Sequence, residues 1–148
     1  MKVYLASPFF NEAELKIYDE VIDLLRSEGE LSVFVPREHT IPDAWALPNH
    51  IWGENVFAVD YLAITQCDVV VVLNFGMYSD SGTAWECGCA YALGKKVVNV
   101  LCGEANEEYS IMMVNGTTAT VTLNELRYNH LKYCIEFEKD TNKKIIQK

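Results

Sequence analysis

A continuous apolar segment that leads into a helix is the feature that most constrains the fold of this chain. Residues 68–73 contain four consecutive valines and a leucine without polar alternation, which is typical of a strand buried on both faces of a parallel sheet. Residues 80–94 follow after a short loop, start with helix-capping residues and end on Gly94, a common residue just after a helix. A second apolar run comes at 96–102. This order predicts parallel strands joined by a helical crossover.

The rest of the chain continues this alternation of strands and helices. Further strands are expected at 2–6, 31–35 and 119–122, and further helices at 11–28, 53–66 and 124–138. Right-handed crossovers then give one domain over residues 1–148, an α/β, doubly wound, five-stranded parallel sheet of the flavodoxin-like (Rossmann-like) order 2-1-3-4-5 with helices on both faces. Ligands of such sheets bind where the strand order reverses, so the loops at 7–10 and 74–82 should line the cleft.

The composition restricts the partners and cofactors of the chain. Its formal net charge of −9 argues against polymeric nucleic acid and against anionic membrane surfaces. The five cysteines form no Cys-x-x-Cys pair and the three histidines lack metal-ligand spacing, so we expect reduced thiols, no metal and no cofactor. Apolar runs stay shorter than the roughly 18 residues of a membrane helix. These features predict a cytoplasmic protein.

Carboxylates remain as the reactive groups at the expected cleft. The sequence has no Gly-x-Gly-x-x-Gly dinucleotide motif, no Gly-Lys-Ser/Thr phosphate loop and no Gly-x-Ser-x-Gly nucleophile elbow. The cleft instead offers Asp60, Asp80 and Glu86, together with Tyr4 from the first strand. Carboxylates without a metal cluster suit glycosyl chemistry, in which one attacks the anomeric carbon and another assists the leaving group.

Each carboxylate also has a purely structural interpretation. With Thr83 as N-cap, Glu86 is the N3 residue of a capping box; otherwise it is a nucleophile directed into the cleft. Asp60 is either an exposed helix residue or an acid whose pKa is raised by its apolar neighbours. Asp80 is either a turn or cap residue or a group that binds a sugar hydroxyl.

The longest irregular stretch is expected at residues 36–52. It holds three of the four prolines and two of the three tryptophans. A loop of about 17 residues in a compact domain is usually functional or disordered, and the aromatic residues argue against disorder. Trp45 and Trp52 are therefore candidate stacking surfaces for a ligand, or else anchors that fix the loop to the core.

Two stretches resemble the nucleoside 2-deoxyribosyltransferase family. They are residues 2–11, Lys-Val-Tyr-Leu-Ala-Ser-Pro-Phe-Phe-Asn, and residues 80–94, which contain the pattern Asp-x-Gly-x-x-x-Glu-x-Gly. The order of elements and the chain length resemble the family along nearly the whole chain. The resemblance implies an enzyme of nucleotide salvage that exchanges free purine or pyrimidine bases on 2′-deoxyribonucleosides. It implies a covalent 2-deoxyribosyl ester as intermediate and retention of the β configuration.

The resemblance also implies roles for individual residues. Glu86 matches the nucleophile, Asp60 the residue that handles the proton of the base, and Asp80 the residue that holds the 5′-hydroxyl. Tyr4 matches a tyrosine beside the nucleophile that orients it. The further substrate-binding candidates are Ser7, Phe9, Phe10, Gly82, Trp45, Trp52 and Ser110.

The chain departs from the family pattern at three places. Family members often complete the site with an asparagine from a neighbouring subunit, for which Ser110 or Asn115 are the candidates here. A glutamine that reads purines in some members is replaced by Thr40 or the nearby His39, and the C-terminus is not aromatic.

The resemblance implies a homo-oligomer, built from dimers or hexameric. Two alternative functions stay open. One is a 2′-deoxynucleoside 5′-monophosphate N-glycosidase, whose family shares part of the motif. The other is a nucleoside-binding module without catalysis.

Overall fold

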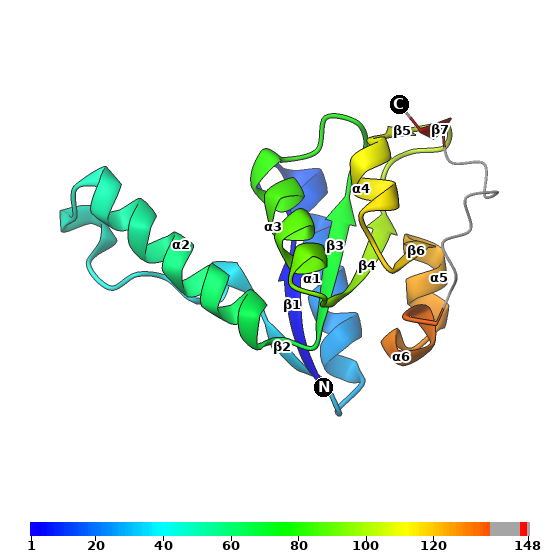
Figure 1. The fold of residues 1–148 in the computed structure, drawn as a ribbon, viewed down its shortest axis with the longest axis horizontal. Coiled ribbons are helices and arrows are strands. Elements are labelled where there is room, and N and C mark those ends of the chain that lie inside the picture. Colours follow the sequence, from blue (N-terminus) through cyan, green and yellow to red (C-terminus); the bar gives the residue numbers. More distant parts are fainter. Residues whose placement is uncertain (137–145, 148) are drawn as a thin grey trace.

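The computed structural model describes residues 1–136 and 146–147. Its centre is a five-stranded, all-parallel sheet in the order β2-β1-β3-β4-β6 (Figure 1). Because β6 is the fifth strand of this sheet along the chain, the predicted doubly wound α/β fold and its strand order are confirmed. The strands are β1 (Lys2–Ala6), β2 (Ser32–Phe34), β3 (Val69–Asn74), β4 (Lys96–Leu101) and β6 (Ala119–Thr122).

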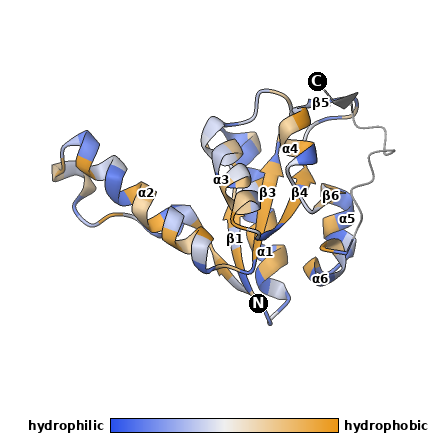
Figure 2. Cartoon of the chain, in the orientation of Figure 1, coloured by the Kyte–Doolittle hydropathy of each residue, from blue (hydrophilic) through white to orange (hydrophobic). Residues whose placement is uncertain are grey.

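Helices cover both faces of the sheet because its strands are apolar on both sides (Figure 2). On one face, α1 (Glu12–Ser27), α5 (Leu123–Tyr128) and α6 (Leu131–Cys134) pack on strand residues such as Leu5 and Val71. On the other face, α2 (Asn49–Gln66), α3 (Ser81–Ala92) and α4 (Ile111–Asn115) pack on the alternate residues, such as Ala6 and Val70. Tyr4 and Glu86 meet on this second face.

The start of α3 differs from the sequence-based expectation. The N-cap is Asp80, not Thr83, because the Asp80 carboxylate accepts hydrogen bonds from the backbone N–H of Thr83 at 2.8 Å and from its hydroxyl at 3.1 Å. Glu86 therefore lies in the second turn of the helix and is not the N3 residue of a capping box. A complete capping box occurs instead at α5, where Thr122 and Glu125 bond each other reciprocally.

The segment after β2 is shorter and more ordered than expected. Two 3₁₀ helices, Pro36–Glu38 and Ala44–Ala46, lie within it. The α2 helix begins at Asn49 rather than near residue 53, directly after Pro48, so Trp52 belongs to a helix and not to a loop.

The expected helix over 124–138 is broken in two. Asn129 and His130 have extended backbone angles between α5 and α6, and the Asn129 amide donates to the Glu125 carbonyl at the end of α5. Residues 137–138 of the predicted helix lie outside the described part of the chain. Two short strands, β5 (Glu108–Tyr109) and β7 (Ile146–Gln147), pair outside the main sheet.

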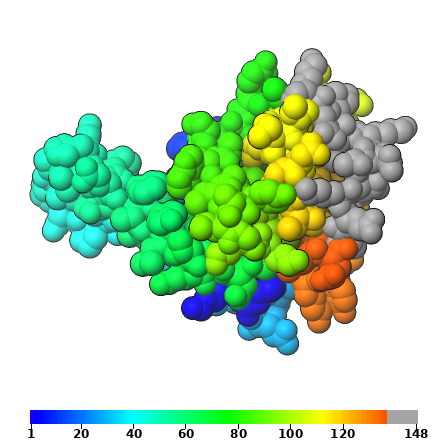
Figure 3. Space-filling view, in the orientation of Figure 1, coloured from blue at the N-terminus to red at the C-terminus, as the bar shows by residue number. Residues whose placement is uncertain are grey.

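Helix α2 extends away from the sheet as an arm (Figures 1 and 3). Only Ile64 of its 18 residues is buried, although the helix is rich in apolar and aromatic side chains. Its C-terminal end is held by Lys95, whose ammonium group donates to the carbonyls of Thr65 at 2.7 Å and Cys67 at 2.9 Å. Within the described residues, no helix has the length and apolar character needed to cross a bilayer.

Replacing Lys95 by methionine should loosen the attachment of α2. The variant keeps the apolar stem but loses two charge-assisted hydrogen bonds, so we expect a loss of about 1–3 kcal/mol in the free energy of unfolding, measured with urea. The matched control is Lys96→Met, since Lys96 is an exposed neighbour and its replacement should cost less than about 0.5 kcal/mol. Equal losses in the two variants would contradict the anchoring role of Lys95.

Candidate active site

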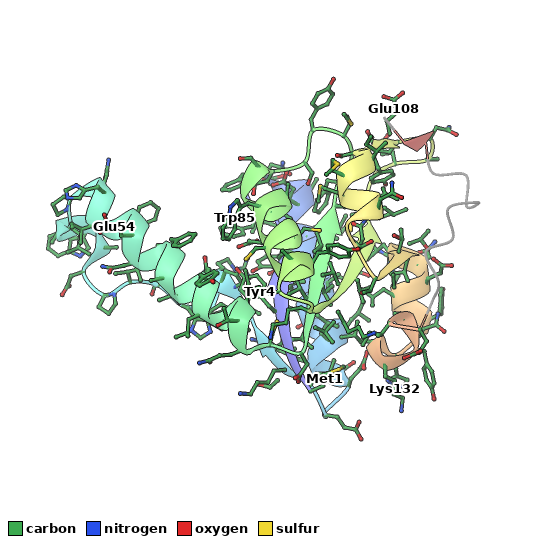
Figure 4. The ribbon with its side chains drawn as sticks, in the orientation of Figure 1. Met1, Tyr4, Glu54, Trp85, Glu108 and Lys132 are labelled. Carbon is green, nitrogen blue, oxygen red and sulfur yellow. The ribbon has the colours of Figure 1, made fainter. Side chains whose placement is uncertain are left out.

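A hydrogen bond between Tyr4 and Glu86 joins the sheet to α3. The Tyr4 hydroxyl donates to Oε1 of Glu86 at 2.6 Å, and the Tyr4 side chain is completely buried. Tyr4 lies on β1, opposite Val70 of β3, so its ring faces the side of the sheet that α3 covers. Figure 4 labels Tyr4 and also Trp85, the neighbour of Glu86 on α3. The Glu86 carboxylate is thus held by a side chain from a rigid strand of the sheet.

A stack of three rings continues from Tyr4 to the segment after β2. The Phe34 ring lies 5.4 Å from the Tyr4 ring, with planes 11° apart. The His39 ring in turn lies 4.0 Å from the Phe34 ring, with planes 6° apart. His39 is thereby fixed against the same rings that support the hydroxyl bound to Glu86.

Glu86 lines a cavity of about 390 Å³ at the carboxyl ends of the strands. This volume lies within the usual range for small-molecule sites. One side, formed by the loop after β1 and the start of α3, contributes polar groups such as Asp80 together with the Phe9 and Phe10 rings. The other side, formed by residues 36–44 and α2, contributes several apolar side chains together with Asp60 and further polar groups. Both sides of the cavity therefore carry a carboxylate.

Asp80 and Gly82 depend on each other at the start of α3. The Asp80 Oδ2 atom caps the helix through Thr83. A Cβ atom on Gly82 would lie 2.9 Å from that oxygen, closer than such atoms normally approach. A side chain at position 82 would therefore displace the Asp80 carboxylate from its position at the start of the helix. The hydrogen bonds to Thr83 occupy Oδ2, and Asp80 itself lines the cavity.

The burial of Glu86 among like charges changes its protonation. Burial raises the pKa of Glu86 to about 7, and the nearby carboxylates of Asp60 and Asp80 act in the same direction. The hydrogen bond from Tyr4 opposes this shift because it favours the ionised form. Near neutral pH the Glu86 carboxyl is therefore divided between its acid and its ionised form.

The surroundings of Asp60 favour its protonated form more than water does. Burial raises its pKa, and the nearby His39 partly opposes that shift. The part of the chain that the structure describes offers the Asp60 carboxylate no hydrogen bond or ion pair within 4 Å. Its oxygens therefore remain available to a ligand in the cavity.

The structure brings most of the predicted site residues together. Those that line the cavity are Glu86, Asp60, Asp80, Ser7, Phe9, Phe10, Gly82 and Trp52. Trp45 does not line it, because its side chain is 88% exposed on the second 3₁₀ helix and points neither into the cavity nor into the core. Ser110 also lies apart from it, at the start of α4.

Sequence reasoning missed several residues that line the cavity. Arg37, Ile41 and Ala44 come from the segment that was expected to be functional, but nothing in their spacing singled them out. Val56 and Val59 lie on the face of α2 that also carries Trp52 and Asp60. Helical spacing from Trp52 would have indicated them, had the start of α2 been placed correctly.

A second hollow, of about 640 Å³, lies at the ends of β4 and β6. Its Arg127 is engaged by Glu20, and its Tyr109 hydroxyl accepts from the Gly103 N–H. This hollow lacks the arrangement of a held carboxylate beside a second acid, so we place the candidate chemistry at Glu86. Within the described residues, no group of three or more histidine, cysteine or acidic side chains could hold a metal ion.

Comparison with known proteins agrees with this geometry. The sequence profile of the nucleoside 2-deoxyribosyltransferase family matches residues 3–141. The chain belongs to this family. It is similar to the solved 2-deoxyribosyltransferase of the psychrotolerant bacterium Bacillus psychrosaccharolyticus, with 32% sequence identity and a TM-score of 0.80. That similarity covers 93% of this chain and 98% of the bacterial enzyme. No curated protein sequence matched the chain.

More distant structures share the fold of this deoxyribosyltransferase-family chain. The CMP N-glycosidase of Clostridium botulinum has 22% identity and a TM-score of 0.59, over 85% of this chain and 98% of that one. The 2-desoxiribosyltransferase of Leishmania mexicana has 21% identity and a TM-score of 0.52, over 79% and 72%. At these identities the similarity concerns the fold alone.

Replacing Glu86 by glutamine should stabilise the protein at alkaline pH. The folded state holds the Glu86 proton more tightly than the unfolded state. The free energy of unfolding therefore falls as the pH rises from the unfolded pKa, 4.5, to the folded pKa, about 7. Glutamine does not titrate and can still accept from Tyr4. We therefore expect the free energy of unfolding of Glu86→Gln, minus that of the unmodified protein, to be about 2 kcal/mol larger at pH 8 than at pH 5. The variant thus gains stability relative to the unmodified protein as the pH rises.

This prediction is measured by urea unfolding at both pH values. The matched control is Glu54→Gln, because Glu54 is exposed on α2 and should show the same difference at pH 5 and pH 8. A Glu86→Gln difference that does not change with pH would contradict the raised pKa.

Proposed function

We propose that the protein is a nucleoside 2-deoxyribosyltransferase that exchanges the base of 2′-deoxyribonucleosides through a covalent ester on Glu86. The observation that supports this most directly is the Glu86 carboxylate, which is held by Tyr4 in a cavity that also contains Asp60. Membership of the family and the similarity to a bacterial 2-deoxyribosyltransferase support the same reaction. The substrates are 2′-deoxyribonucleosides and free nucleobases, and the reaction needs no metal or cofactor.

The first half-reaction forms the ester. An ionised Glu86 oxygen attacks C1′ of the sugar, and the electron pair of the C1′–N bond leaves with the base. Asp60, whose pKa is raised by burial, gives its proton to the departing base. Tyr4 keeps Glu86 in position through its hydrogen bond, and Asp80 binds a sugar hydroxyl on the side of the cavity formed by the start of α3.

The second half-reaction reverses these roles. A nitrogen of the incoming base attacks C1′ of the ester, Glu86 leaves as a carboxylate, and Asp60 takes up the proton that the base loses. Two displacements at the same carbon retain the β configuration. A 2′-hydroxyl would make the oxocarbenium-like transition state harder to reach, which explains a preference for deoxy sugars.

The cavity favours transfer over hydrolysis of nucleoside monophosphates, although it contains one cation. Arg37 lines the cavity and could in principle bind a phosphate. However, its guanidinium group is paired with Asp19 and packs over the Tyr18 ring, 5.1 Å from the ring centre. The loop after β1 adds no charged group, since Ser7 donates its hydroxyl proton to the Pro8 carbonyl. A 5′-phosphate would therefore meet a single arginine, whose charge is already shared with Asp19.

Replacing Glu86 should abolish base exchange without unfolding the protein. We expect Glu86→Ala and Glu86→Gln to lower transfer from deoxyinosine to adenine by at least about 10³-fold, because the attacking group is lost. Chromatography of the products, with circular dichroism to check the fold, measures both effects. In the unmodified protein, deoxyadenosine formed from thymidine as well as deoxyinosine would show a broad base specificity.

The same assay separates the alternative functions. Base release from a deoxynucleoside monophosphate, without transfer, would replace the transferase by an N-glycosidase. Near-normal transfer by Glu86→Gln would remove the nucleophile assignment. Binding of nucleosides without turnover in the unmodified protein would leave a binding module.

We also infer that the protein works as a homo-oligomer, dimer-based or hexameric, that covers the arm formed by α2. Phe57, Tyr61 and Trp85 form a connected aromatic patch, with ring centroids 5.8 and 5.3 Å apart, and all three are at least 40% exposed. Exposed apolar patches of this kind mark interaction surfaces. A neighbouring subunit is also the route by which a residue such as Ser110 would reach the side of the cavity that carries Asp80.

Light scattering should therefore give a mass of at least two chains, each of 16.8 kDa. Phe57→Lys places a charge within the aromatic patch and should shift the protein toward the single-chain mass. The control is Tyr128→Lys on α5, which is 86% exposed and far from α2 along the chain. A single-chain mass for the unmodified protein at working concentration would contradict this inference.

A further inference from the structure

We propose that Thr83 is a positioning residue for the sugar: its hydroxyl fixes the Asp80 carboxylate so that one particular oxygen, Oδ1, faces the substrate. This inference rests on the proposed function, in which Asp80 binds a sugar hydroxyl. Thr83 lies in the first turn of α3 and lines the cavity, yet it is only 2% exposed. We therefore assign it an effect through Asp80 rather than a contact of its own with the substrate.

Thr83 donates two hydrogen bonds to a single oxygen of Asp80. Its backbone N–H lies 2.8 Å from Oδ2 of Asp80, and its hydroxyl lies 3.1 Å from the same atom. The backbone bond is the usual contact between an N-cap side chain and the first turn of its helix. Capping does not require the second bond, from the hydroxyl. The hydroxyl is therefore the feature that a helix cap alone does not explain.

The second bond restricts the rotation of the Asp80 carboxylate. The terminal torsion of an aspartate has broad minima, so a single bond to Oδ2 still allows the carboxylate to turn. The hydroxyl of Thr83 narrows this range, because a β-branched side chain is stiff at its first torsion. Oδ2 also lies close to the backbone of Gly82, where an added Cβ atom would be 2.9 Å away. The position of Oδ2 is thus defined by two donors and by the backbone of Gly82.

The other oxygen of Asp80 is left for the substrate. A carboxylate oxygen offers about two lone-pair sites, and the two donors of Thr83 use those of Oδ2. Among the described residues, Oδ1 takes part in no hydrogen bond and no ion pair. Asp80 lines the same cavity as Glu86. Because an ionised carboxylate only accepts hydrogen bonds, Oδ1 is suited to a sugar hydroxyl, which can donate one.

The burial of Thr83 makes its hydroxyl and the Asp80 carboxylate depend on each other. Because Thr83 is almost fully buried, its hydroxyl has little access to water, and Asp80 is the partner to which it donates. A buried hydroxyl without a partner costs free energy, so the Thr83 rotamer that bonds Asp80 is favoured. The oxygen that faces the substrate is therefore oriented before the sugar binds, which reduces the entropy lost on binding.

Valine at position 83 tests the hydroxyl on its own. Thr83→Val keeps the branched shape and the backbone N–H bond to Oδ2 but removes the second donor. Base exchange with adenine is measured for two nucleosides, deoxyinosine and 2′,5′-dideoxyinosine, which lacks the hydroxyl that the family resemblance assigns to Asp80. The quantity compared is kcat/KM for deoxyinosine divided by kcat/KM for the 5′-deoxy analogue. This ratio reports the hydroxyl contact, because a general loss of active protein cancels from it.

We expect the ratio to fall by about fivefold in Thr83→Val, mainly through a higher KM for deoxyinosine, which is the size of one weakened hydrogen bond. Thr83→Ser keeps the hydroxyl and loses only the methyl group, so its ratio should stay close to that of the unmodified protein. Thr117→Val is the matched control, since Thr117 is also buried and its hydroxyl donates to the Val114 carbonyl, outside the cavity. An unchanged ratio in Thr83→Val, or an equal fall in either of the other two variants, would overturn the proposal.

Calorimetric binding of the same two nucleosides keeps this proposal separate from the proposed function. If no base is exchanged, the proposed function fails, yet the ratio of the two affinities should still fall about fivefold in Thr83→Val. If exchange occurs and neither ratio changes, the transferase stands and the role of Thr83 is rejected.

A second variant tests the same orientation if Thr83→Val does not fold. In Gly82→Ala the added methyl group displaces Oδ2 of Asp80 from the two donors of Thr83, so the ratio should fall here as well. An unchanged ratio in this variant would also overturn the proposal.

Discussion

The hydrogen bond between Tyr4 and Glu86 is the interaction on which the rest of the site depends. It connects the central region of the sheet to a helix that starts only after β3 has ended, so it fixes α3 by its second turn as well as by its cap. One strong donor and two like-charged neighbours act in opposite directions on the protonation of this buried carboxyl. The donor favours the ionised form, which the proposed mechanism requires, whereas burial and the two aspartates favour the protonated form. Removal of any one of these influences would change the pKa of Glu86.

The start of α3 places its own demands on Asp80 and Gly82. Asp80 must cap the helix and also face the cavity, and Gly82 provides the space for its Oδ2 atom. If Glu86 had been the capping residue, its carboxylate would have been occupied by backbone N–H groups. Because Asp80 performs that task one turn earlier, Glu86 is free to be oriented by Tyr4 instead. The helix cap and the candidate nucleophile are thus separate residues with separate partners.

The sequence was sufficient for the fold because the apolar runs of β3 and β4 leave few alternatives to a buried parallel sheet. It was insufficient where two residues suit the same structural role. Asp80 and Thr83 are both good N-caps, and only three-dimensional contacts decide between them. Trp45 and Trp52 belong to one segment of similar composition, yet only Trp52 lines the cavity, because α2 begins early enough to include it. At the break before α6, the Asn129 side chain donates to the Glu125 carbonyl, a contact that no periodicity reveals.

The ring stack gives the candidate site a property that no single residue has. Phe34 stacks on both His39 and Tyr4, so a residue of the cavity wall and the hydroxyl that binds Glu86 share one support. Phe34 is part of β2, an edge strand of three residues, and is held to the sheet by its pairing with Tyr4 in β1. Any shift of that edge strand would move His39 and disturb Tyr4 together. The position of this part of the cavity wall and the orientation of the Glu86 carboxylate are therefore mechanically coupled through one aromatic side chain, although the two groups lie on different elements.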